Sequence, residues 1–402
     1  MRAVPGRAKR GQVSGRIFLL AAEPWGDAIG ARLIRALREQ GPGDLELAGV
    51  GGRRMARCGL SSPFPMQLSS PHLAGMLSPG LRLWLRLRQT AQEVERRRPD
   101  LVLTIGSPGF ALRLQGRLAG RPLLRVQYEA PQVWAWREAP AARLARNVDH
   151  LLTLLPFEPA FFARYGVPCS FVGHPLVEDV KASVDGPRFR RRYQLPADAP
   201  VLCLLPGSRA GEIRQHMPVL EQAVALVWRQ VSQLRLVLPT VASLAPLVKR
   251  LVARWQLPVL VLEDRAERFD AYAASWLGIT ASGNISLEVA LAGLPAISIF
   301  RTGAWGGLLA RRLTRVPHVN MVNLILGRPA VPELLQEDCR ADRIAAAAVR
   351  LIGDEALRRD QQSALAEAVG HLHGNDERPP SQRAAARILE LLAEGPNARR
   401  TA

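Results

Sequence analysis

The sequence predicts an α/β protein built from two Rossmann-like, doubly wound parallel-sheet domains. Three observations support this prediction. The chain has 402 residues, which exceeds one ordinary domain and suits two units of about 150 to 180 residues each. Hydrophobic residues make up 48% of the chain, which is enough for two packed cores. Short apolar runs alternate with helical periodicity, and this alternation is typical of βαβ units.

The first domain is expected at residues 16–180, after a basic extension at residues 1–15. The extension has no apolar periodicity, so we expect it to be disordered. The domain itself should begin with a strand at 17–21 and a helix at 27–39. Its further strands are expected at residues 101–105, 123–128, 150–154 and 170–172.

The second domain is expected at residues 181–370, because a second series of apolar runs begins after the charged, proline-marked stretch 181–200. Helical periodicity then dominates from 341 to 392, apart from a polar break at 373–381. The terminal segment 371–402 contains a last helix that is a candidate for crossing back to the first domain. The expected strands of the second domain are 201–205, 234–238, 259–262, 277–280 and 296–300.

The formal net charge of +19 would attract nucleic acid, an anionic membrane or a phosphorylated substrate. The excess is almost entirely arginine, which a GC-rich genome could also produce without selection on function. Since the chain contains no recognised nucleic-acid-binding module, we do not expect nucleic acid as a partner.

The four cysteines are scattered without the spacing of a zinc site or a disulfide framework. We therefore expect neither a structural zinc site nor disulfides, and a reducing cytosolic environment fits best. We also expect no other metal and no cofactor. No apolar stretch reaches the 18 residues that suggest a membrane span. If a membrane matters, the protein should lie on its surface.

Two loops after expected strands of the second domain have the composition of anion sites. Gly207, Ser208, Arg209 and Glu212 follow the strand at 201–205 and open a helix. Small residues allow close backbone approach, and a guanidinium can bind phosphate in a forked geometry. We expect a diphosphate there, the alternative being an ordinary turn with a solvated arginine.

The second loop of this kind contains Ser282, Gly283 and Asn284 and precedes a helix that carries Glu288. Its backbone N–H groups could face phosphate oxygens, while Glu288 could accept hydrogen bonds from both ribose hydroxyls. Together the two loops indicate a nucleotide site. Alternatively, Glu288 is only an acid that stabilises the positive end of a helix.

The corresponding loops of the first domain contain residues 22–27, 106–109, 129–137 and 173–175. Trp136 could stack on a sugar or simply pack in the core. His174, beside a glycine and a proline, could be a binding residue or a structural histidine. Together with Glu23 and Gly26, Trp136 and His174 are the candidate residues for binding the acceptor, the second substrate of the reaction.

Seven motifs occur in order along the chain, at residues 133–137, 155–158, 171–175, 204–209, 281–283, 323–325 and 331–336. Together they resemble the lipid A disaccharide synthase family over about residues 17–392. The resemblance implies a glycosyltransferase B-type fold, with the two domains facing a central cleft. It also implies metal-independent, inverting transfer of a diacylated glucosamine from UDP to the 6-hydroxyl of diacylglucosamine 1-phosphate, which forms a β-1,6 disaccharide.

The resemblance further implies that Asn323, Gln336 and Glu288 complete the donor site. Arg209 and two helix N-termini would hold the negative charge that develops on the departing diphosphate. The implied partners are the UDP-linked acylated donor, the phosphorylated acceptor and an anionic membrane, on the cytoplasmic face of a Gram-negative inner membrane. A homodimer is left open.

The chain departs from the family pattern in two loops. Pro24 and Trp25 stand where the family has small residues, and Gly106 and Gly109 stand where it has aspartates. The aspartate at the position of Gly106 is the family's implied general base. Asp27 and Glu129 are the nearby acids that could replace it.

The segments 81–98 and 305–315 are basic and apolar enough to rest on an anionic leaflet, although the period of the first suits neither helix nor strand, and a solvated face would also explain them. The loop at 67–79 also differs from the family. Two alternative hypotheses remain beside the synthase. One is a divergent UDP-sugar-binding relative with a changed acceptor or lost catalysis, and the other is a nucleic-acid-binding protein.

Overall fold

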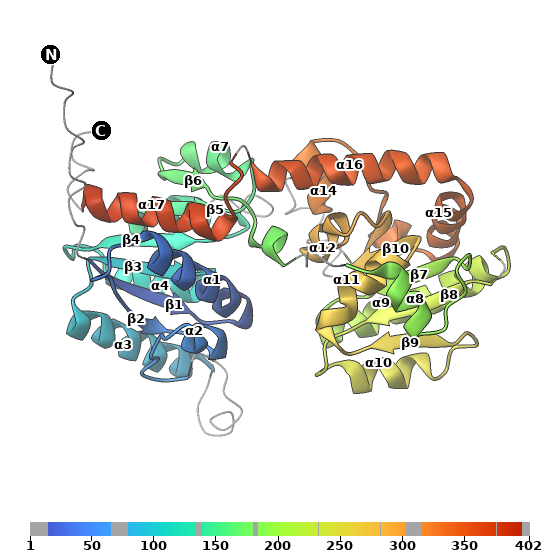
Figure 1. Ribbon diagram of the computed structural model, residues 1–402, viewed down its shortest axis with the longest axis horizontal. Helices are drawn as coiled ribbons and strands as arrows, with labels where there is room; N and C mark the ends of the chain where they lie inside the picture. Colours follow the sequence, from blue (N-terminus) through green and yellow to red (C-terminus); the bar gives the residue numbers. More distant parts are fainter. Residues whose placement is uncertain are drawn as a thin grey trace, which may run out of the picture. The chain divides into compact units, whose positions relative to one another are not determined.

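A computed structural model describes residues 15–65, 79–133, 139–179, 184–231, 233–281, 283–301, 316–374 and 376–395. The chain divides into two compact units (Figure 1). The first unit comprises Met1–Val133, Glu138–Pro175 and Asn375–Ala402, and the main segment of the second is Leu176–Gly374. Several expectations concern positions outside the described residues: the extension at 1–14, the segment 305–315, most of the loop at 67–79, Trp136 and Ser282.

The first unit contains a six-stranded sheet in the order β2-β1-β3-β4-β5-β6, and every neighbouring pair is parallel. The chain passes from β1 to β2 on one side and then to β3 on the other. The direction in which successive strands are added to the sheet therefore reverses between β1 and β3. In such sheets ligands usually bind at the carboxyl ends of the two strands that flank this reversal. The strands are β1 (Arg16–Ala21), β2 (Glu46–Val50), β3 (Leu101–Ile105), β4 (Leu124–Tyr128), β5 (His150–Thr153) and β6 (Cys169–Phe171).

Helices cover both faces of this sheet because alternate side chains of a strand point to opposite faces. On β1, Ile17 and Leu19 belong to the core shared with α1 and α17, whereas Phe18 and Leu20 pack with α3 and α4. The C-terminal helix α17 thus packs against α1 in the first unit (Figure 1). The helices are α1 (Pro24–Gln40), α2 (Arg53–Arg57), α3 (Pro79–Arg97), α4 (Pro108–Arg117), α6 (Ala139–Asn147), α7 (Glu158–Ala163) and α17 (Pro380–Glu394).

The segment whose period suited neither helix nor strand is the helix α3. Leucine and arginine alternate at its start, which resembles a strand. The apolar residues that it buries, however, are Leu87, Ala91 and Val94, with Leu83 partly buried. Their spacing of four, four and three is helical, so packing against the sheet selects the helix.

The second unit contains another six-stranded parallel sheet, in the order β12-β11-β10-β7-β8-β9. This order reverses between β7 and β10, which are hydrogen-bonded neighbours. The strands are β7 (Val201–Leu205), β8 (Arg235–Pro239), β9 (Val259–Leu262), β10 (Leu277–Ala281), β11 (Ala296–Phe300) and β12 (Glu333–Leu335). The fold prediction of two doubly wound parallel sheets is confirmed, but it lacked the edge strands β2 and β12.

Helices also cover both faces of the sheet of the second unit. Leu202 and Leu204 pack with α9 and α15, while Cys203 and Leu205 pack with α11, α12, α14 and α16. The α-helices are α8 (Gly186–Arg192), α9 (Ala210–Trp228), α10 (Ala245–Val252), α11 (Arg268–Ala274), α12 (Ile285–Leu291), α14 (Met321–Leu326), α15 (Ala341–Gly353) and α16 (Glu355–His373). Among the helices of the described chain, none combines the length and hydrophobicity that a bilayer crossing requires.

Candidate active site

The two predicted anion loops of the second unit lie at the same edge of its sheet. The loop that starts at Pro206 follows β7, and the loop that contains Gly283 and Asn284 follows β10. Since β7 and β10 are parallel neighbours, their carboxyl ends are adjacent. This is the reversal point of the sheet, where open parallel sheets bind ligands.

Hydrogen-bond donors in the loop after β7 converge on one carboxylate, that of Glu212. Its Oε2 accepts from the backbone N–H groups of Ser208 at 2.9 Å and Arg209 at 3.2 Å. Its Oε1 accepts from Nη1 of Arg209 at 2.7 Å. The Arg209 side chain is also 81% exposed, so a ligand in this loop could contact its guanidinium. The loop therefore already holds one anionic group.

Gly207 is required in this loop for two reasons. Its φ of +126° lies in a region that side-chain-bearing residues avoid. A Cβ at this position would lie 2.6 Å from Oε2 of Glu212, which is too close. Any other residue at 207 would displace the carboxylate that organises the donors.

His216 is buried on α9 and joins this loop to the end of β11. Its Nδ1 lies 2.7 Å from the Pro206 carbonyl oxygen, and its Nε2 accepts from the backbone N–H of Arg301 at 3.2 Å. A carbonyl can only accept and an amide N–H can only donate, so the ring is neutral with its proton on Nδ1. The sequence analysis did not identify His216. The sequence feature that could have indicated His216 is that it is a polar residue on an otherwise apolar face of α9, which it shares with Ile213 and Leu220.

Glu288 lies in the first turn of α12, after the loop that follows β10. Its Oε2 forms an ion pair with Nε of Arg268 at 2.9 Å, and both side chains are largely buried. Burial first, and then the charge of Glu288, raise the pKa of Tyr272, whose hydroxyl hydrogen-bonds Glu288. The carboxylate is thus held in a fixed orientation by α11.

Asn323 has contacts that differ from those of a ligand-binding amide. Its Oδ1 accepts from the N–H groups of Ala330 and Val331, and its Nδ2 donates to the Val331 carbonyl, each at 2.8 Å. It is fully buried. These bonds give Asn323 a structural role that closes the loop before β12, and they do not support direct contact with a donor. Gln336 follows β12 directly, with a φ of +51°.

In the first unit, the carboxyl edge of the sheet brings together Trp25, in the first turn of α1, and Gly106 and Glu129, from the loops after β3 and β4. The indole Nε1 of Trp25 donates to Oε2 of Glu129 at 3.1 Å. A Cβ built on Gly106 would lie 3.1 Å from the same oxygen. The carboxylate of Glu129 therefore lies beside the position where a side chain at residue 106 would begin.

The backbone around this cluster is held in an uncommon conformation. Gly106, Ser107 and Glu129 have φ values of +61°, +45° and +79°. The buried Gln127 amide donates to the carbonyls of Gly106 at 3.3 Å and Glu129 at 3.0 Å. Left-handed non-glycine residues are costly and often occur at functional sites. Gln127, which the sequence analysis did not identify, supplies bonds that maintain this geometry.

The surroundings of Glu129 favour its protonated form. Burial, assisted by the negative charge of Glu158, raises the pKa of Glu129 to about 7, and the hydrogen bond from Trp25 opposes this shift. Trp25 also lies near His174, with ring centroids 6.1 Å apart. Burial lowers the pKa of His174 to about 3, so its imidazole is neutral at physiological pH.

Asp27, the other candidate base, is committed to the start of α2. Its Oδ1 accepts from the N–H groups of Gly52 at 2.8 Å and Met55 at 3.0 Å, and its Oδ2 accepts from Arg54 at 3.0 Å. These bonds satisfy helix N-terminal donors and argue against Asp27 as a base. Gly26 is needed for packing, because a Cβ there would lie 2.9 Å from the Ile105 carbonyl oxygen. Glu23 is exposed.

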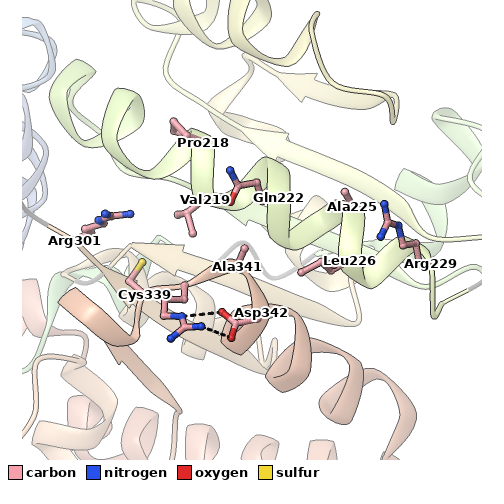
Figure 2. A pocket seen from close by; sticks show the side chains of 11 residues that line it. Pro218, Val219, Gln222, Ala225, Leu226, Arg229, Arg301, Cys339, Ala341 and Asp342 are labelled. Carbon is pink, nitrogen blue, oxygen red and sulfur yellow. Dashed lines mark hydrogen bonds and ion pairs between the residues drawn. The ribbon is translucent and has the colours of Figure 1, made fainter.

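A separate groove of about 610 Å³ lies in the second unit between α9 and the start of α15 (Figure 2). Its lining includes Pro218, Val219, Arg229 and Arg301, and Arg340 beside it is paired with Asp342. None of the predicted site residues lines this groove. Within the described part of the chain, no group of three or more His, Cys, Asp and Glu side chains is placed to hold a metal ion.

Comparisons with known proteins point to one family. A family model described as lipid-A-disaccharide synthetase matches residues 17–388. The chain is 44% identical over 381 residues to a lipid-A-disaccharide synthase of Rhodospirillum centenum, covering 94% of this chain and 95% of that protein. It is 42% identical over 389 residues to the synthase of Granulibacter bethesdensis, covering 94% and 99%.

Solved structures show a similar fold at low identity. A UDP-GlcNAc 2-epimerase of Neisseria meningitidis, bound to UDP-GlcNAc, has a TM-score of 0.65 at 12% identity, over 94% of this chain and 100% of that one. MurG of Acinetobacter baumannii has a TM-score of 0.53 at 15% identity, over 94% and 100% of the two chains.

Proposed function

The chain belongs to the lipid-A-disaccharide synthetase family, and on that premise we propose how its strand-end loops carry out the transfer. The enzyme is a glycosyltransferase of lipid A biosynthesis. In our proposal a diacylated glucosamine passes from UDP to the 6-hydroxyl of diacylglucosamine 1-phosphate. The second unit binds the UDP part of the donor, and the first unit binds the acceptor.

The observation that carries the donor assignment is the convergence of donors on Glu212. Two backbone N–H groups and the Arg209 guanidinium already surround one carboxylate, at the reversal point of the sheet. A diphosphate carries more charge than a carboxylate and offers more acceptor oxygens, so it would compete well for Arg209. Charge on the departing UDP would be stabilised by the same groups.

The ribose would lie against Glu288 at the neighbouring loop. The ion pair with Arg268 orients the Glu288 carboxylate, which suits a group that accepts hydrogen bonds from two hydroxyls. Gly283 and Asn284 would approach the diphosphate with their backbone. Gln336, after β12, completes the proposed donor set, whereas Asn323 supports it from within the fold.

Binding of UDP by the purified protein tests this proposal. UDP at 100 times its Kd should raise the free energy of unfolding by about 2.7 kcal/mol through linkage, seen as a higher melting temperature. Arg209→Ala should remove most of this increase. Arg229→Ala, at the other end of α9, is a matched control that should keep it. No change of melting temperature with UDP would contradict the donor assignment.

We also propose that α3 contacts an anionic membrane surface, with the enzyme peripheral on the inner face of the inner membrane. Large exposed hydrophobic side chains of the described residues include Leu81 and Trp84, at 42% and 43% exposure, near the start of α3. Arginines flank them, and the Arg88 guanidinium lies 5.6 Å from the Trp84 ring centroid. Apolar and cationic side chains together favour binding to anionic lipid.

Vesicle sedimentation tests the membrane proposal. The protein should pellet with vesicles that contain anionic phosphatidylglycerol and much less with pure phosphatidylcholine. Leu81→Ser with Trp84→Ser should weaken binding about tenfold or more, because each buried large side chain contributes roughly 1.5–3 kcal/mol. Trp228→Ser is the control, since Trp228 is 48% exposed in the second unit. Equal losses in both variants would contradict a role for α3.

A further inference from the structure

Transfer to a hydroxyl requires a group that accepts a proton. The acceptor oxygen forms a bond to the anomeric carbon, the bond from that carbon to the diphosphate oxygen breaks, and UDP leaves with the electron pair. The hydroxyl proton must pass to a base, and such assistance contributes about 10²–10⁴ in rate. Gly106 and Gly109 have no side chain that could accept it.

The described carboxylates in the loops after β1, β3, β4 and β5, or in the first turns of the helices that follow them, differ in how many hydrogen bonds they already accept. Asp27 accepts three backbone N–H groups. Glu158 accepts those of Leu154 and Leu155, both at 3.0 Å. Glu129 accepts a side-chain hydrogen bond from Trp25 on Oε2. Glu23, which also follows β1, is exposed. Glu129 is thus the largely buried carboxylate of this set with capacity for a ligand.

Space for a ligand lies directly beside this carboxylate. Apart from chain neighbours, Oε2 of Glu129 is the one described atom within 4 Å of a Cβ built on Gly106, at 3.1 Å. An oxygen atom at that point would be within hydrogen-bond distance of the carboxylate. The missing side chain of Gly106 therefore leaves room for a hydroxyl group at the distance that proton transfer requires.

The geometry points to Glu129 as the catalytic base for the acceptor hydroxyl, with Gly106 providing the space for that hydroxyl and Trp25 acting as a positioning residue for the carboxylate. This inference rests on the proposed function. In the step, Glu129 takes the hydroxyl proton as the acceptor oxygen bonds to the anomeric carbon on the face opposite the departing UDP. The configuration at that carbon inverts, and Glu129 ends protonated.

The electrostatics of the site are consistent with this role. The pKa of Glu129 is raised to about 7, chiefly by burial, so the carboxylate is a stronger base than an ordinary glutamate and is still ionised in part at neutral pH. The Trp25 hydrogen bond lowers that pKa and restricts the side-chain rotation of Glu129. Removing this bond should shift the pH profile as well as the rate.

The experiment measures kcat of the purified full-length protein with UDP-diacylglucosamine and diacylglucosamine 1-phosphate. Glu129→Gln should lower kcat about 10²–10⁴-fold while the UDP-induced increase in melting temperature stays unchanged. Trp25→Phe keeps the ring beside His174 but loses the N–H donor. Its kcat profile should therefore move to higher pH, which loss of packing alone would not produce.

A rescue variant separates the loss of the base from a structural effect of the substitution at residue 129. Glu129→Ala removes the carboxylate, and Gly106→Asp in the same chain returns one from the adjacent position. Asp tolerates the left-handed conformation of residue 106 better than most residues. The kcat of the double variant should be at least tenfold higher than the kcat of Glu129→Ala.

The outcomes separate the two levels of the proposal. Wild-type kcat in Glu129→Gln would overturn the inference and leave the proposed function standing, as would a loss of kcat in Asp27→Asn but not in Glu129→Gln. Absence of disaccharide with the wild-type protein would overturn both. Loss of the UDP effect in Glu129→Gln would assign Glu129 a structural role and also overturn the inference.

Discussion

The two units present the same kind of sheet edge but build their sites differently. In the second unit, the anion loop presents backbone N–H groups and the Arg209 guanidinium. Gly207, Glu212 and His216, which lie in the loop or just after it, shape this loop. In the first unit, the reactive group that we infer comes from a neighbouring strand. Glu129 follows β4, yet its carboxylate lies beside Gly106 after β3.

This difference teaches how a site can change while its fold stays. A site made of backbone donors needs a particular local conformation, so its sequence is constrained over a few consecutive residues. A site that needs one carboxylate only requires the group at a point in space. Parallel strands bring several loops to that point, so the carboxylate can come from any of them.

The largest effect predicted from this comparison is a dependence of the first unit's stability on pH. The pKa of Glu129 is raised from 4.5 to about 7 in the folded protein. The folded state therefore holds its proton more tightly than the unfolded state. The resulting stability is fully present below pH 4.5 and is lost as pH rises to about 7. Glu129→Gln cannot ionise and should not show this loss.

Thermal unfolding of wild type and Glu129→Gln at pH 5 and pH 8 measures the effect. From pH 5 to pH 8, the variant should gain about 2 kcal/mol relative to wild type. This corresponds to roughly 4–8 °C in the Tm of a unit of this size. If the Tm difference between wild type and Glu129→Gln were the same at pH 5 and pH 8, the pKa of Glu129 would not be raised by burial. The description of the first unit's site in this comparison would then be wrong.

A smaller effect tests the second unit. His216→Ala removes both hydrogen bonds that join Pro206 and Arg301, and each is worth about 0.5–1.5 kcal/mol. UDP affinity, measured by calorimetry, should fall about fivefold to tenfold because the loop loses its support. His216→Asn can still donate to the Pro206 carbonyl and should lose less. Equal affinity in all three proteins would show that the loop holds its shape without His216.

Much of the fold followed from the sequence, for a physical reason. Strands buried on both faces read as continuous apolar runs, and the predicted bounds of β3, β7 and β11 equal those in the structure. The strands β2 and β12 lie at sheet edges, where partial exposure relaxes the need for apolar residues. The helix α3 was ambiguous because arginines alternate with leucines before the buried face becomes evident.

The sequence alone determined which loops are the candidate ligand loops, since strand ends and glycine-containing loops are local features. It also supplied the set of acids from which the base must come. Only the tertiary structure separated Asp27, which caps α2, from Glu129, which lies beside Gly106. That choice depends on contacts between residues 23 or more positions apart, and hydrogen bonds across such separations have no signature in a linear pattern of residue types.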